Sequence, residues 1–178
     1  MRIDTQAGLL IGANFCETAH CDDRKAADDM SLIVVHGISL PPGQFGGSDV
    51  IDLFQGTLDC NKHPYYAQLS GVKVSSHVFI RRDGEVVQFV PFHLRAWHAG
   101  MSRFANRTAC NDFSIGIELE GTDTSSYTDT QYESLNAVLV ALRDAYPSLA
   151  QAPVVGHSDI APQRKTDPGL GFDWGRVK

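Results

Sequence analysis

Hydrophobic and polar positions along the chain change period several times, and two of these patterns predict strands that carry candidate functional residues. Residues 32–35 are an uninterrupted β-branched and apolar run, which predicts a short buried strand ending at His36. From 113 to 119 apolar and polar residues alternate, which predicts a strand with one apolar face. Gly116 and Glu118 fall together on its other face, where the glycine should leave space beside the carboxylate.

Further short apolar runs predict the rest of a sheet. Residues 74–80 and 85–90 are expected to be two strands, and Asp83-Gly84 between them is a hairpin signal. A last strand at 153–155 would deliver His157 to the sheet edge. Residues 95–110 have no clear period and are expected to form a long loop.

Two segments carry helix signals. Thr128 and Gln131 fit a capping box, and the stripe that follows has helical spacing and stops before Pro147: Tyr132, Leu135, Val138, Leu139, Leu142. Ser48 could begin a shorter helix that Gly56 ends. Since strands and helices interleave, we predict an α/β (mixed α+β) fold, with a central mixed β-sheet flanked by helices. We expect one domain over residues 1–178, with 1–30 as an irregular lead-in.

Composition narrows the class of partner. The 178 residues have 43% hydrophobic and 20% charged positions, as in a soluble globular protein, and the net charge of −6 argues against nucleic acid and anionic membranes as partners. No run approaches the ~18 apolar residues of a membrane span. The first 15 residues lack the pattern of a secretion signal, so we expect a cytoplasmic protein with reduced, mostly buried cysteines. A nucleophilic role for Cys16, Cys60 or Cys110 is a weak alternative.

The loop at 156–169 contains several candidate functional side chains among glycine and proline residues. It contains His157 and Asp167, and His36 is expected at a strand end far upstream. Each residue alone is more simply explained as structural: a core histidine or a turn aspartate. Together, two histidines and one aspartate would fill three corners of a zinc tetrahedron and leave the fourth for water.

Two further residues suit hydrolysis at such a site. Glu118 could act as a general base, and Lys165, two residues before Asp167, could stabilise an oxyanion. The simpler alternatives are a solvated edge strand for the glutamate and a surface position for the lysine. His77 and His98 could line or shape the pocket, and we do not expect them to be metal ligands.

Five separated motifs, in order along most of the chain, resemble the N-acetylmuramoyl-L-alanine amidases of the AmpD type. They lie at residues 32–36, 75–84, 95–100, 111–121 and 156–169. The resemblance implies a cytoplasmic zinc amidase of cell-wall recycling. It would cut the amide between the lactyl group of 1,6-anhydro-N-acetylmuramic acid and the L-alanine of the stem peptide, and so indirectly limit β-lactamase induction.

By the same resemblance, one zinc ion (Zn2+) per chain would be held by His36, His157 and Asp167. Glu118 would activate water, and Lys165 would stabilise the oxyanion. We expect a monomer whose partner is the anhydromuropeptide substrate.

Substrate contacts are less determined by the sequence. An aromatic face suits a sugar ring, which favours Trp97, and an arginine suits a stem-peptide carboxylate. Arg103, Arg107 and Arg81 are all candidates for that contact. Two other functions stay open: a catalytically silent module that binds peptidoglycan fragments, and a structural zinc protein.

Overall fold

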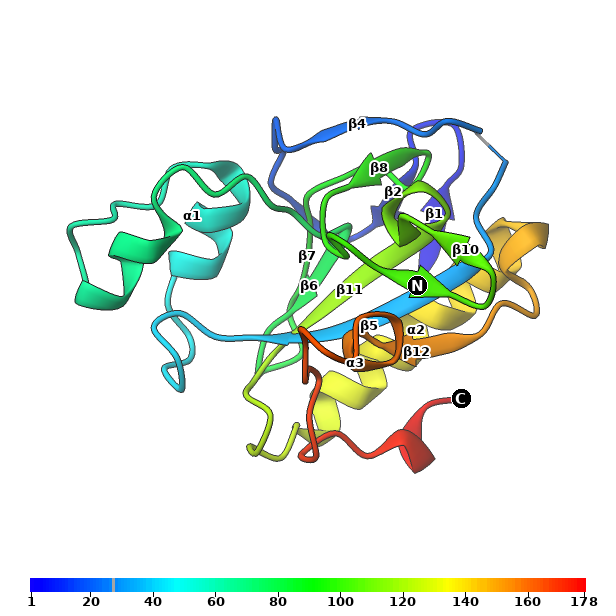
Figure 1. Cartoon of the computed structure of the whole chain (residues 1–178). Coiled ribbons are helices and arrows are strands. Elements are labelled where there is room, and N and C mark those ends of the chain that lie inside the picture. The colour runs from blue at the N-terminus through cyan, green and yellow to red at the C-terminus, as the bar shows by residue number, and fades with distance from the viewer. Residues whose placement is uncertain (27) are drawn as a thin grey trace.

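A mixed six-stranded sheet lies at the centre of the computed structural model, which describes residues 1–26 and 28–178 (Figure 1). Its strands, in spatial order, are β12 (Val154–Gly156), β5 (Leu32–Ile38), β11 (Ser114–Glu120), β6 (Val78–Ile80), β7 (Val86–Gln88) and β3 (Asn14–Phe15). The first four are parallel, and β7 is antiparallel to β6. The expected class, α/β with a central mixed sheet, is confirmed.

The two central strands are buried on both faces. Every residue of β11 is buried: β5 and β6 flank it in the sheet, α2 packs on one face, and the His98 ring contacts Ser114 and Gly116 on the other. Its odd-numbered residues, such as Ile117, pack with Val35 in the main core cluster, to which Leu135 and Leu139 of helix α2 belong. The even-numbered residues therefore face away from α2 and are enclosed, which rules out the alternative of a solvated edge strand for Glu118.

Helix α2 (Asp129–Ala145; Figure 1) begins with the predicted capping box and ends before Pro147. Helix α1 (Asp49–Gln55) begins after Ser48, and Gly56 ends it with a φ of 75° that favours glycine. With the short helix η1 (Pro64–Leu69), α1 forms a lobe over residues 40–74 that projects to one side of the sheet (Figure 1). The remaining short helices are η2 (Cys110–Asp112), η3 (Pro147–Leu149), α3 (His157–Ile160) and η4 (Trp174–Arg176).

The expectation of an irregular lead-in over residues 1–30 is wrong. Strand β1 (Arg2–Asp4) pairs with β2 (Leu9–Ile11), β3 joins the central sheet, and β4 (Cys21–Asp23) pairs with β8 (Leu94–Ala96). These strands have two or three residues each, which is too short for a hydrophobic period to be visible. The segment expected as a loop at 95–110 likewise contains a hairpin of β9 (Arg103–Phe104) and β10 (Arg107–Thr108).

Buried hydrogen bonds fasten the N-terminal segment to the sheet. Arg24 is 7% exposed, and its guanidinium donates to four backbone carbonyls, those of Phe92, Asn111, Asp112 and Ser114. All four cysteines are unpaired; Cys110 is buried and the others are half-buried, which corrects the expectation of mostly buried thiols. Among the described residues, no helix is both long and apolar enough to cross a membrane.

Candidate metal centre and active site

Three neighbouring parallel strands bring candidate residues to the same edge of the sheet. His36 lies on β5, Glu118 is its register partner on β11, and His157 follows directly after β12. The carboxyl ends of parallel strands form the usual ligand-binding edge of such a sheet. Strand β5 continues two residues beyond the predicted end at His36, so the histidine projects from the strand itself.

The three predicted ligands meet with their donor atoms close together. His36 Nδ1 lies 2.9 Å from His157 Nδ1 and 3.2 Å from Asp167 Oδ2, and the remaining pair is 3.1 Å apart. A tetrahedral zinc ion with metal–ligand distances of 2.0–2.2 Å places neighbouring ligand atoms roughly 3.3 Å apart. The three atoms therefore fit three corners of a zinc site.

The protonation states of these groups also suit a cation. Burial lowers the pKa of His36 to about 4, so its imidazole is neutral near pH 7. Burial would raise the pKa of the Asp167 carboxyl, but His157 and His36 outweigh it and hold that pKa well below the usual range. A neutral imidazole and an ionised carboxylate are the forms that bind a metal.

Other polar groups hold the histidine rings in place. His36 Nε2 lies 2.8 Å from His98 Nδ1, and His157 Nε2 lies 3.3 Å from the Ala99 carbonyl oxygen. Arg164 donates to that same oxygen at 2.6 Å and to the Met101 carbonyl, and so joins the 156–169 loop to the 98–101 segment. Such contacts behind metal ligands orient them.

Glu118 is a buried carboxyl with an unused acceptor. Its side chain lines the cavity, and its Oε2 has no hydrogen-bond partner among the described residues. Burial and the nearby Asp167 carboxylate raise the pKa of Glu118 well above its ordinary value, against the opposing effect of Lys165. A raised pKa suits a group that takes up a proton and later returns it.

The space beside Gly116 is occupied, which corrects the prediction that it lies open next to Glu118. A Cβ atom at Gly116 would lie 2.4 Å from Cγ of His98. The glycine is therefore required by the close approach of the histidine ring. His98 both lines the cavity and shapes it, as predicted.

A cavity of about 600 Å³ opens over the site. Glu118, His157, Lys165 and Asp167 line it together with Trp97. Its other wall comes mainly from the 40–74 lobe, through a largely apolar set that sequence reasoning missed: Leu40, Pro42, Leu53, Phe54, Tyr65, Leu69, Val72, Val74. Leu40, Leu53 and Phe54 also belong to a buried core cluster, and nothing in the sequence indicates that such residues face a cavity as well.

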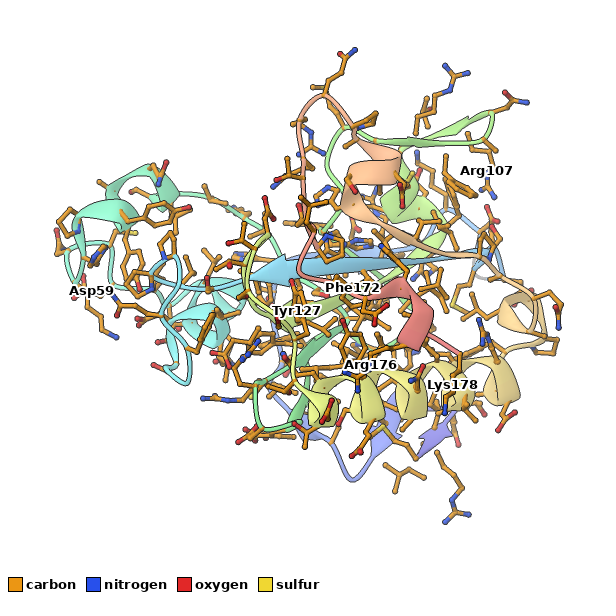
Figure 2. The ribbon with its side chains drawn as sticks, turned by 90° about the horizontal axis from the view of Figure 1, so that it is seen from below. Asp59, Arg107, Tyr127, Phe172, Arg176 and Lys178 are labelled. Atoms are coloured by element: carbon orange, nitrogen blue, oxygen red, sulfur yellow. The ribbon has the colours of Figure 1, made fainter. Side chains whose placement is uncertain are left out.

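The candidate arginines lie elsewhere. Arg107 pairs with Asp29 and covers the ring of Phe113, on the opposite side of the molecule from the lobe that carries Asp59 (Figure 2). Arg81 donates to the Gly46 carbonyl and Arg103 is exposed on β9. Among the described residues that line the cavity, none of the three arginines occurs. Their predicted contact with a stem peptide stays a prediction.

In the metal-free protein, we expect the free energy of unfolding to fall as the pH decreases from 6.5 to 5. Burial lowers the pKa of His36 to about 4 and holds those of His77 and His98 well below 6.5. The unfolded chain takes up a proton at each histidine near pH 6.5, whereas the folded chain does not. Glu118 acts oppositely, because burial raises its pKa and its folded form binds a proton first.

The effect of the three histidines exceeds that of the one glutamate. The free energy of unfolding should therefore decrease by up to about 3 kcal/mol for each unit by which the pH is lowered. Urea unfolding of the chelator-treated protein at pH 6.5 and pH 5 measures it. Equal or greater stability at pH 5 would show that these imidazoles are not buried in the neutral form.

Comparison with known proteins assigns the family. The family model for N-acetylmuramoyl-L-alanine amidase matches residues 26–170. The chain is 55% identical over 173 residues to the 1,6-anhydro-N-acetylmuramyl-L-alanine amidase AmpD of Escherichia coli K12, covering 97% of this chain and 94% of that protein.

Solved structures of related amidases support the same family assignment. A crystal structure of a selenomethionine AmpD derivative superposes with a TM-score of 0.95 at 54% identity, over 100% of both chains. The amidase AmiD from E. coli, in complex with anhydro-N-acetylmuramic acid-L-Ala-D-gamma-Glu-L-Lys, superposes with a TM-score of 0.61 at 28% identity, over 85% of this chain and 57% of that one. The chain therefore belongs to the N-acetylmuramoyl-L-alanine amidase family and is an amidase of the AmpD type.

Proposed function

We propose that this amidase hydrolyses the bond between the lactyl group of 1,6-anhydro-N-acetylmuramic acid and the L-alanine of the stem peptide, with one zinc ion per chain. The names of its relatives support the substrate, and AmiD was solved with such a muropeptide bound. The observation that carries the proposal is the unpartnered Oε2 of Glu118 in a cavity that His157 and Asp167 also line, next to the cluster that these two residues form with the buried His36.

His36, His157 and Asp167 would hold the metal. Three protein donors leave the fourth tetrahedral position open, as catalytic rather than structural zinc sites do. A zinc ion in this position supplies Lewis acidity, which polarises the scissile carbonyl and makes a water molecule more acidic.

The remaining steps belong to Glu118 and Lys165. The Glu118 carboxylate takes a proton from the attacking water, and the resulting carboxylic acid returns it to the leaving amide nitrogen. The Lys165 ammonium, on the same cavity, stabilises the negative charge that develops on the carbonyl oxygen. The apolar wall of the 40–74 lobe holds the substrate and limits the access of bulk water.

The other candidate functions fit the site less well. A binding module that has lost catalysis has no use for a buried, unpartnered carboxyl, and burying Glu118 without a partner is unfavourable. A structural zinc site would need a fourth protein ligand. Within residues 1–26 and 28–178, only three donors gather.

The proposal extends to compartment and assembly. Four cysteines that form no disulfide are typical of a reducing compartment, which supports a cytoplasmic role in recycling. The metal donors, Glu118 and Lys165 form a site that is complete without a residue from a second subunit, so a monomer would suffice for the reaction.

The test pairs metal content with activity on the purified protein. We expect about one zinc per chain, release of stem peptide from an anhydromuropeptide, loss of that release with a chelator, and recovery when zinc is restored. Zinc binding without cleavage would favour the silent binding module. Cleavage that survives complete zinc removal would contradict the proposed metal role.

A further inference from the structure

A series of hydrogen bonds that begins at the Cys110 backbone carbonyl determines which ring nitrogen of His36 is free to bind a metal. The Ser114 hydroxyl lies 2.6 Å from the Cys110 carbonyl oxygen, and its oxygen lies 3.1 Å from His98 Nε2. His98 Nδ1 lies 2.8 Å from His36 Nε2. Ser114 is fully buried and His98 is 9% exposed, so little water competes for these groups.

The direction of every proton in this series follows from its first member. A carbonyl oxygen only accepts, so the Ser114 hydroxyl donates its single proton to Cys110. The Ser114 oxygen can then only accept from His98, which places the proton of that neutral ring on Nε2 and leaves Nδ1 bare. His98 Nδ1 in turn accepts from His36 Nε2.

His36 therefore has its proton on Nε2, and its Nδ1 lone pair points at His157 Nδ1 and Asp167 Oδ2. We propose that His98 and Ser114 are positioning residues that select this tautomer of His36 and so prepare its Nδ1 to bind zinc. The inference rests on the proposed role of His36 as a metal ligand.

Gly116 makes room for the His98 ring in this series of hydrogen bonds. It lies between Ser114 and Glu118 on β11, and the His98 ring packs where its side chain would be. This glycine lets the His98 ring lie against β11, within reach of both His36 and Ser114.

Ser114→Ala is the sharpest test, because it removes one oxygen atom and the partner of His98 Nε2. His98 can then carry its proton on Nδ1, which places a proton on Nδ1 of His36 and opposes metal binding. We expect zinc affinity to fall about 10- to 100-fold, as measured by competition with a chelator. Ser76→Ala is the matched control: Ser76 is equally buried, and its hydroxyl donates to the Gly116 carbonyl outside this series of bonds.

Variants of His98 separate hydrogen bonding from packing. His98→Leu should weaken zinc binding at least as much as Ser114→Ala, and His98→Asn should recover part of the loss because its amide oxygen can accept from His36 Nε2. Zinc affinities of Ser114→Ala and His98→Leu within threefold of wild type would overturn the proposal. If His98→Leu does not fold, Ser114→Ala decides.

The tautomer itself can be measured without metal. In the metal-free wild-type protein, the imidazole ¹⁵N resonances of His36 should show a proton on Nε2 alone, and Ser114→Ala should add the Nδ1-protonated form. A wild-type His36 protonated on Nδ1 would overturn the proposal. Failure of the wild-type protein to bind zinc would instead contradict the proposed function, since the tautomer measurement does not depend on it.

Discussion

Glu118→Gln is expected to bind zinc like the wild-type protein and to lose turnover by about a thousandfold or more. The amide has nearly the shape of the carboxyl, so the metal donors stay in place, but it cannot take a proton from water or return one to the leaving nitrogen. Steady-state release of stem peptide, with zinc content measured on the same sample, separates chemistry from metal loss. KM should change little, because the substituted group acts on the reacting atoms.

The matched control for this substitution is Glu120→Gln, two residues further along β11. Glu120 is equally buried, but its carboxylate oxygens accept from the backbone N–H groups of Gly46 and Arg82, away from the donor set. We expect it to affect stability and to leave the chemical step intact. Near-normal turnover of Glu118→Gln would refute the general-base assignment.

Asp167→Ala is expected to lose the metal. The change removes one of three protein donors and the only carboxylate among them, so zinc affinity should fall by more than the roughly 10- to 100-fold typical of residues that only orient a ligand. Dialysis against a weak chelator, followed by metal analysis, should then leave the variant zinc-free. Activity should be lost with the metal and return in part at high zinc concentration, because Glu118 and Lys165 remain.

Asp129→Asn provides the same change of charge on the exposed surface of α2 and should keep both zinc and activity. An Asp167→Ala protein that retains one zinc per chain through dialysis would show that this carboxylate is not a ligand. Loss of activity with the metal retained would point instead to a role of Asp167 in catalysis alone.

The sequence predicted helix α2 and the β6–β7 hairpin well, because the signals for both are local. The capping box of Thr128 and Gln131 and the hairpin at Asp83-Gly84 each depend on residues a few positions apart. The N-terminal strands were missed for the opposite reason. Strand β4 pairs with β8, more than 70 residues later, and nothing within its three residues indicates that partner.

By itself the sequence identified the residues to which we assign the chemistry: His36, His157 and Asp167 as proposed donors, and Glu118 and Lys165 as the proposed base and cation. These residue types at the ends of apolar runs, in motifs that resemble an amidase family, were sufficient because reactive groups are few. Only the tertiary structure decided how those groups are held and what surrounds them.

Three particular results depended on the folded chain. Ser114 and His98 reach His36 across 62 or more residues of sequence, the space beside Gly116 is filled by an imidazole, and one wall of the cavity comes mainly from the 40–74 lobe. The physical reason is the same in each case. Hydrogen-bond direction and close packing are set by atoms that are distant along the chain and adjacent in space, and no local pattern of residues records them.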